Sequence, residues 1–267
     1  MSHPERLLLP FVIAAAAALA MPAAHAQFSL AVSPPRFELA TKAGVPVRDV
    51  IELSSDDPRA TRYSVKTADW RLEPNGGVAF SDELAAGSCR PWVVIERREI
   101  TVATGRPYRF RFEVAPPADT GPVECRFAIM LEGVAQALGN MPLPVAARVG
   151  VVVYLSVGDV APKLVLTGAG VETVNGVATP VLRIRNDGTA HARLDGFLAG
   201  TDAAGRSLEF TPSTLPVLPG ETRTLELVAT VAGNTSTTVV PQYPVTVKGK
   251  LEWGNGQSMA LEQRFAP

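Results

Sequence analysis

The longest alternation of apolar and other positions in the chain covers residues 143–157, LPVAARVGVVVYLSV. Every odd position is apolar, whereas the even positions include Pro144, Arg148 and Gly150. A period of two residues is typical of a β-strand with one apolar face. Fifteen residues extend over about 50 Å, whereas an ordinary strand covers roughly 20 Å. We therefore expect this strand to run the height of one domain and lead into a second, or to present apolar side chains beyond its own core.

The same alternation recurs in shorter runs before this strand, at residues 47–54, 61–70, 92–95, 99–102, 106–114 and 124–131. The first run, FSLAVSPPRFELAT, is broken by Pro34 and Pro35. Because proline has no amide hydrogen for a ladder, the pair predicts an edge or a place where the strand changes sheets. Turn residues separate the runs, and no helical period occurs. This pattern predicts an immunoglobulin-like β-sandwich.

After a hinge at residues 158–162 the alternation begins again and continues to residue 265. Runs at 163–166, 180–185, 192–200, 208–210, 221–231, 243–253 and 258–265 predict a second sandwich, the last two forming a hairpin. The predicted fold class is therefore all-β, with two immunoglobulin-like sandwich domains joined through the long strand. We expect the first domain at residues 27–157 and the second at 158–267.

Residues 1–26 have the pattern of a secretory signal peptide. Arg6 is followed by an apolar run that contains Pro10, and the segment ends in an Ala-x-Ala sequence at Ala26. A single membrane anchor is the alternative, but the run is short for a span and no basic stop-transfer sequence follows. We expect export, with cleavage after Ala26 and no stable membrane insertion.

The net charge of −1 gives no basic surplus with which to bind nucleic acid, so no nucleic-acid partner is expected. Cys89 and Cys125 are the only cysteines. In an exported chain they predict one disulfide near one end of the sandwich, with two buried free thiols as the alternative.

The exported chain contains few residues that could form a catalytic or metal-binding site. His3 and His25 leave with the signal peptide, so His191 is the one histidine left, and we expect it at the surface beside a turn. A multi-histidine metal site is therefore excluded, and a nucleophile–histidine site has only His191 available. The sequence contains no phosphate loop and no GxSxG motif. We expect no enzyme, no cofactor and no metal.

Several stretches of the first half carry a resemblance: SPPRFELATKAG, VIELSSDD, Trp70 before a turn, PWVVIERREITVATGRPYRFRFEV and CRFAIMLEG. In this order they resemble the strands of the periplasmic pilus-assembly chaperones of the PapD type. The opening alternation resembles the seventh strand of that family. The likeness covers nearly all of the first domain, whereas the second domain matches only in size and strand pattern.

The resemblance implies a mode of binding. In that family the seventh strand lies in the groove of a pilin subunit that lacks its last strand, and supplies alternate apolar side chains. Two basic residues between the domains hold the terminal carboxylate of the subunit. By position, the subunit-binding residues correspond to Arg36, Met141, Leu143, Val145 and Arg148. Arg148 enters as a replacement, because the second basic position of the family falls on Gly150, two residues later on the same face.

Two prolines set this strand apart from the family pattern. Pro142 and Pro144 remove two amide donors from the same side of the strand. This either weakens pairing with a client or protects an exposed edge from aggregation.

The sequence therefore predicts a non-catalytic periplasmic chaperone that binds fimbrial or pilus subunits by β-strand addition. Its expected partners are pilin-like subunits, an outer-membrane usher and, through a free seventh strand, a second copy of itself. The alternative is a structural or adhesive surface module with immunoglobulin-like domains.

Overall fold

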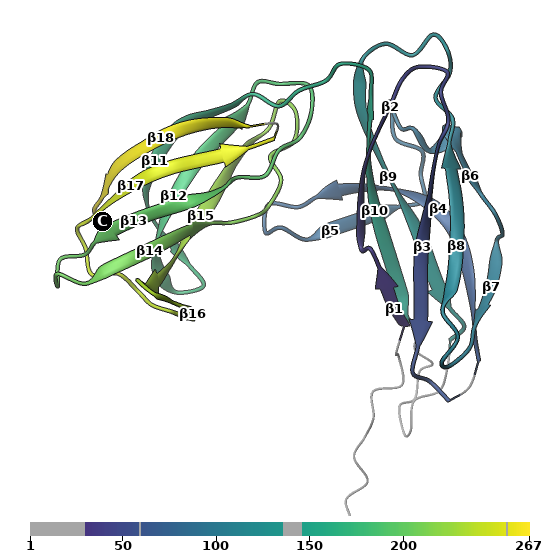
Figure 1. Cartoon of the computed structure of the whole chain (residues 1–267), viewed down its shortest axis with the longest axis horizontal. Helices are drawn as coiled ribbons and strands as arrows, with labels where there is room; N and C mark the ends of the chain where they lie inside the picture. The colour runs from purple at the N-terminus through teal and green to yellow at the C-terminus, as the bar shows by residue number, and fades with distance from the viewer. Residues whose placement is uncertain (1–29, 59, 136–145, 255) are drawn as a thin grey trace, which may run out of the picture.

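The structure is a computed structural model that describes residues 30–58, 60–135, 146–254 and 256–267 (Figure 1). The predicted signal peptide and the positions Met141, Leu143 and Val145 lie outside the described residues. Within the described ranges, every regular element is a strand apart from the short 3₁₀ helix η1 (Arg90–Trp92). The all-β prediction is confirmed, and Figure 1 shows two bodies of strands joined by the segment after β10.

The first sandwich consists of two sheets. One has the order β1-β3-β8-β6, and the other has the order β2-β10-β9-β4-β5, with β7 paired to β4. Their bounds are β1 (Leu30–Ser33), β2 (Arg36–Thr41), β3 (Val47–Ser55), β4 (Thr61–Leu72), β5 (Val78–Ser81), β6 (Val93–Ile95), β7 (Glu99–Val102), β8 (Tyr108–Val114), β9 (Val123–Gly133) and β10 (Arg148–Val157).

The proline pair of the first run separates β1 from β2 and moves the chain from one sheet to the other. β1 pairs antiparallel with β3, whereas β2 pairs parallel with β10 in the opposite sheet. The predicted change of sheets is confirmed. Proline suits this position because the chain between two ladders needs no amide donor there.

The predicted long strand is β10. Its odd residues Val151, Val153, Leu155 and Val157 are completely buried in the core between the two sheets, as the alternation predicts. The strand is shorter than predicted in the described part of the chain, because Ala146 and Ala147 precede it outside any strand. Only the Ala147 carbonyl takes part in pairing there, accepting from the Gly133 amide at 2.8 Å, where β9 ends.

The two cysteines form the predicted disulfide, and neither is left as a free thiol. Cys89 directly precedes η1, and Cys125 is the third residue of β9, so the bond links the segment before β6 to the opposite sheet. Both cysteines are buried in the core of the first sandwich.

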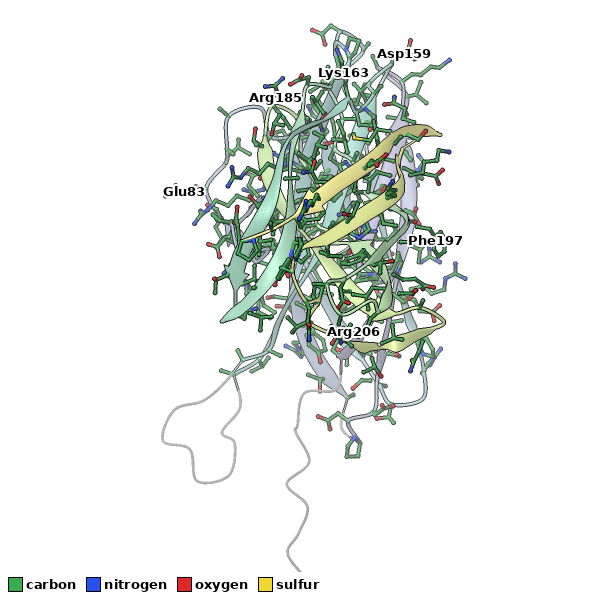
Figure 2. All side chains as sticks on the ribbon, turned by 90° about the vertical axis from the view of Figure 1, so that its left-hand side faces the viewer. Glu83, Asp159, Lys163, Arg185, Phe197 and Arg206 are labelled. Atoms are coloured by element: carbon green, nitrogen blue, oxygen red, sulfur yellow. A yellow bond between two sulfur atoms is a disulfide. The ribbon has the colours of Figure 1, made fainter. Side chains whose placement is uncertain are left out.

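The second sandwich is built from β11 (Leu164–Val174), β12 (Val177–Asn186), β13 (Asp195–Thr201), β14 (Ser207–Pro212), β15 (Thr222–Val231), β16 (Asn234–Thr238), β17 (Val245–Trp253) and β18 (Gln257–Phe265). These strands have the order β11-β12-β15-β14-β13-β17-β18, with β16 paired to β15. Phe210 and Phe265 lie in the core of this sandwich, whereas Phe197 of β13 points away from it and is 91% exposed (Figure 2). The predicted closing hairpin is β17–β18.

Candidate functional site

The first half of β10 has an open side. β9 pairs with β10 over its whole length, Arg148–Val157, whereas β2 pairs only with Val152–Val157. Among the described residues, Arg148–Val151 therefore has no partner strand on the side opposite β9. An unpaired strand edge presents amide and carbonyl groups to any added strand. We call residues 148–151 the open edge.

The open edge belongs to a sheet face that looks toward the second sandwich. Ala68, Trp70, Ala128, Met130 and Tyr154 form a cluster on this face, and Leu218 of the second sandwich packs against it. We call this surface the interdomain face. The β4–β5 hairpin also extends toward the second sandwich (Figure 1), where the Arg223 guanidinium donates to the Glu73 carbonyl at 3.2 Å.

Arg36 lies at the end of the open edge. It is the first residue of β2 and pairs in register with Val152, the first residue of β10 that β2 covers. Its guanidinium is 3.0 Å from the Glu38 carboxylate, and its side chain is half exposed. The alternation of β2 places Phe37 in the core, so Arg36 and Glu38 share the interdomain face.

Arg148 lies at the other end of the open edge, in a cluster of two cations and two anions. Its Nε is 2.9 Å from Glu132, while the Lys66 ammonium is 3.2 Å from Glu132 and 3.0 Å from Asp82. Arg36 is level with Val152, which is four positions after Arg148, or about 13 Å along the strand. The structure therefore does not bring Arg36 and Arg148 to a single point.

Gly150, where the chaperone family has a basic residue, is covered by an aromatic ring. A Cβ added to Gly150 would lie 2.3 Å from Cζ of Phe80 and 3.0 Å from Sδ of Met130. Lysine therefore does not fit unless Phe80 moves. One feature of the sequence points to this contact, because glycine inside an apolar strand is typical of a close approach by another group. The partner, Phe80 of β5, was not predictable from spacing.

The expectation that His191 lies at the surface is wrong. Its side chain is only 8% exposed and lies between the sandwiches, with Nδ1 2.7 Å from the Glu124 carboxylate and Nε2 3.6 Å from Glu38. Its ring stacks on Tyr154 with 3.8 Å between centroids. Glu38, Glu124 and Tyr154 all belong to the first sandwich, so no local pattern around His191 could reveal this burial.

The charges around His191 perturb one another. Burial acts to lower the pKa of His191, but the neighbouring Glu124 and Glu38 carboxylates outweigh it and raise that pKa above its usual 6.5. The contact with His191, aided by Arg193 and Arg36, lowers the pKa of Glu38 to about 2. Arg193 also binds Glu38 directly, with 2.9 Å between Nη1 and Oε1. We call Glu38, Glu124, Tyr154, His191 and Arg193 the interdomain joint.

Arginines surround the Tyr154 phenol on the interdomain face. Burial raises the pKa of Tyr154, and the nearby guanidinium groups of Arg193, Arg126 and Arg36 act in the opposite direction. Arg126 lies over the Trp70 ring at 5.3 Å, and its buried Nη1 has no hydrogen-bond partner among the described residues. Arg36 and Arg193 are already paired with Glu38 here, so the unengaged nitrogen of Arg126 is what this part of the face offers to an anionic group.

In the described ranges, no group of three or more histidine, cysteine, aspartate or glutamate side chains is placed to hold a metal ion. Likewise, no helix in those ranges is long and apolar enough to cross a membrane.

The chain is similar to known proteins in structure but not in sequence. No family model matches the chain, and no curated protein matches it. The class 5 fimbriae chaperone CfaA is 12% identical, with a TM-score of 0.48, and the match covers 90% of this chain and all of that one. The CupB2 chaperone of Pseudomonas aeruginosa is 8% identical, with a TM-score of 0.47 and coverage of 88% and 100%.

A third similar structure is the Salmonella enterica SafA pilin in complex with the SafB chaperone. It is 11% identical, with a TM-score of 0.47 and coverage of 89% of this chain and 96% of that one. Over most of its length, the chain is thus similar to solved structures of chaperones from fimbrial assembly.

Proposed function

We propose that this chain is a periplasmic chaperone that binds fimbrial or pilus subunits by β-strand addition and delivers them for assembly. The observation that carries the proposal is the open edge of β10, paired with β9 on one side only. The donor positions Met141, Leu143 and Val145 precede this edge in the sequence. Their alternate apolar side chains would fill the groove of a subunit that lacks a strand.

Arg36 is the proposed contact for the terminal carboxylate of the subunit. It stands where an added strand along the open edge would meet the start of β2. The surrounding guanidinium groups support this role, because charge-assisted hydrogen bonds to carboxylates are among the strongest. Arg148 is the proposed second basic contact. Its distance from Arg36 implies that it binds a different group of the same client.

We place the protein in the periplasm, exported by a signal peptide at residues 1–26, with domains at 27–157 and 158–267. Pairing of strands and burial of apolar side chains supply the binding energy, so the proposal needs no cofactor, metal or catalytic residue. An outer-membrane usher would receive the loaded chaperone. In the absence of a client, a second copy of the chain would cover the open edge.

The proposal is tested by co-expressing the mature chain with a pilin-like subunit that lacks its last strand and isolating complexes by size-exclusion chromatography. We expect a stable complex with the unaltered chain, and its loss in Leu143→Glu and Arg36→Ala. Val228→Glu, on a half-exposed valine of β15, is the matched control and should retain the complex.

If the unaltered chain forms no complex, or Leu143→Glu leaves the complex intact, the chaperone proposal fails. The structural or adhesive surface module then becomes the better account.

A further inference from the structure

The outer face of the β1-β3-β8-β6 sheet carries two adjoining hollows. This sheet forms the side of the first sandwich opposite the open edge, because β10 belongs to the other sheet. The first hollow has a volume of about 460 Å³, and the second of about 500 Å³. Glu96 and Arg111 line both hollows, so the two lie side by side, and we call the pair of hollows the groove.

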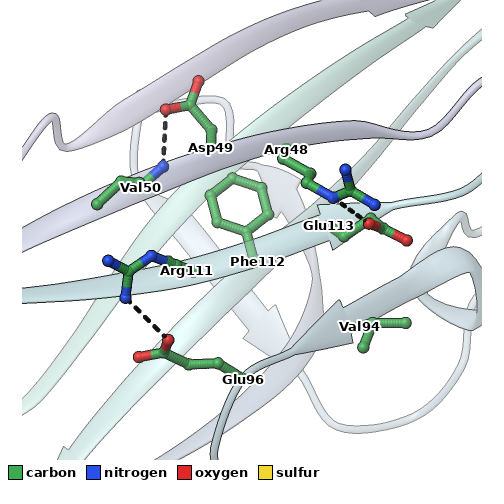
Figure 3. A pocket seen from close by; sticks show the side chains of 8 residues that line it. All are labelled: Arg48, Asp49, Val50, Val94, Glu96, Arg111, Phe112 and Glu113. Carbon is green, nitrogen blue, oxygen red and sulfur yellow. Dashed lines mark hydrogen bonds and ion pairs between the residues drawn. The ribbon is translucent and has the colours of Figure 1, made fainter.

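The first hollow is apolar in its middle and charged at its borders. The side chains of Val50 and Val94 line it, and Val94 on the edge strand β6 is 60% exposed, whereas the Phe112 ring beneath is buried in the core (Figure 3). Two ion pairs border it, one between Arg48 and Glu113 and the other between Arg111 and Glu96, the latter at 3.5 Å (Figure 3). These pairs hold the long side chains at the borders and leave room for one apolar side chain.

The second hollow carries an excess of positive charge. Arg97, Arg106 and Arg109 line it, all exposed, and none of them forms an ion pair with a described residue. Glu96 is its one acidic lining residue and is already engaged by Arg111 and by the Tyr108 hydroxyl, which donates to it at 2.9 Å.

Further acids lie near this hollow. Glu52 is opposite Arg109 in the β3–β8 register, and no ion pair joins these two side chains. Asp57 lies beside the turn that carries Arg106, where its carbonyl accepts from the Thr104 hydroxyl. These two carboxylates reduce the excess of three guanidinium groups without cancelling it. The second hollow therefore offers guanidinium groups that form no ion pair with a described residue, and guanidinium binds carboxylates in a planar, bidentate geometry.

We propose that this groove binds an extended segment of a partner protein in which an apolar residue is followed by acidic residues. The apolar side chain enters the hollow beside Val94, and the carboxylates bind Arg97, Arg106 and Arg109. A flat membrane surface would meet the exposed arginines but would not fill a recessed apolar hollow. The groove and the open edge lie on opposite sheets, so both are accessible at once.

Fluorescence anisotropy on the mature chain tests the proposal with labelled peptides of one phenylalanine followed by four glutamates. We expect this peptide to bind, and peptides with lysine in place of glutamate, or serine in place of phenylalanine, to bind at least about tenfold more weakly. The double variant Arg106→Glu/Arg109→Glu should lose at least about tenfold in affinity for the glutamate peptide. Lys248→Glu/Lys250→Glu makes the same charge change on exposed residues of β17 and should bind like the unaltered chain.

Equal affinity of the unaltered chain and the arginine double variant would overturn the proposal, as would equal affinity for the glutamate and lysine peptides. Phosphatidylglycerol vesicles form a separate arm. Arginine-dependent binding to vesicles without peptide binding would identify a lipid surface and would also overturn the proposal. Subunit capture by the double variant should persist, which separates this test from that of the open edge.

Discussion

The two halves of β10 differ in how they are held. Val152–Val157 lies between β2 and β9. Its Tyr154 belongs to the interdomain joint and is covered by the His191 ring. Among the described residues Arg148–Val151 is paired with β9 alone, and Phe80 and the cluster around Arg148 lie on its face. The apolar alternation is the same in both halves. One continuous pattern thus provides a fixed support and an adjoining edge that is free to pair.

A charge in the closed half should have the largest effect on stability. Leu155 is completely buried, so Leu155→Asp places an unpaired carboxylate in the core and should cost about 4–5 kcal/mol of unfolding free energy. Val149→Asp, at a half-buried position of the open half, is the matched control and should cost clearly less. Urea unfolding measures both variants. Equal losses would show that the two halves are equally buried.

Placing a basic residue at Gly150 in the open half should also destabilise the protein. Gly150→Lys forces the new Cβ against Phe80 and should cost about 1–3 kcal/mol, as overpacking does elsewhere. Phe80→Ala in the same chain removes the opposing ring and should recover part of that loss. A double-mutant cycle measures the coupling. If the changes in unfolding free energy caused by Gly150→Lys and Phe80→Ala were additive, the contact between these two positions would be refuted.

The interdomain joint should make the closed half sensitive to pH. The folded pKa of His191 lies above 6.5, so its stabilising effect is complete at pH values below 6.5 and is lost as pH rises through the folded pKa. Each unit by which that pKa exceeds 6.5 corresponds to about 1.4 kcal/mol. The pH dependence of the imidazole NMR chemical shifts gives the pKa of His191, and urea unfolding gives the free energy of unfolding.

His191→Gln is the matched variant for this experiment. The difference in unfolding free energy between the unaltered chain and this variant should shrink as pH increases. A difference that stays constant through the titration of His191 would mean that its charge does not hold the sandwiches together.

Removing Arg36 should have the smallest effect on stability. Its ion pair with Glu38 is half exposed, and such pairs contribute about 0–1 kcal/mol. Arg183→Ala breaks a comparably exposed pair with Glu172 in the second sandwich and is the matched control. Thermal unfolding should hardly distinguish the two variants, whereas only Arg36→Ala should impair capture of a subunit. A large loss of stability in Arg36→Ala would instead give Arg36 a structural role.

Much of the fold was predictable because strands with one buried face carry their pattern in the sequence. The core residues of β10, the change of sheets at the proline pair and the disulfide are examples. The second half of β11 was missed. Gly168 and Gly170 interrupt its pattern, and the ladder has an irregularity between Leu166 and Gly168.

The site was less predictable, because its side chains come from strands far apart in the sequence. The resemblance predicts Arg36 and Arg148, and the structure adds that Glu38, Glu132 and Asp82 accompany them. The contact of Phe80 with Gly150 and the enclosure of His191 depend on how sheets and sandwiches meet. Neither the spacing nor the composition of the chain contains that information.

The parallel pairing of β2 with β10 also has a consequence for the order of folding. It joins the first strand of one sheet to the last strand of the first sandwich, with β3 to β9 between them in sequence. Contacts of such long range form late, because the intervening chain must first be ordered. The core residue Phe37 thus stays without its register partner until Val153 has emerged. A chain interrupted before that point would expose an apolar strand to its neighbours.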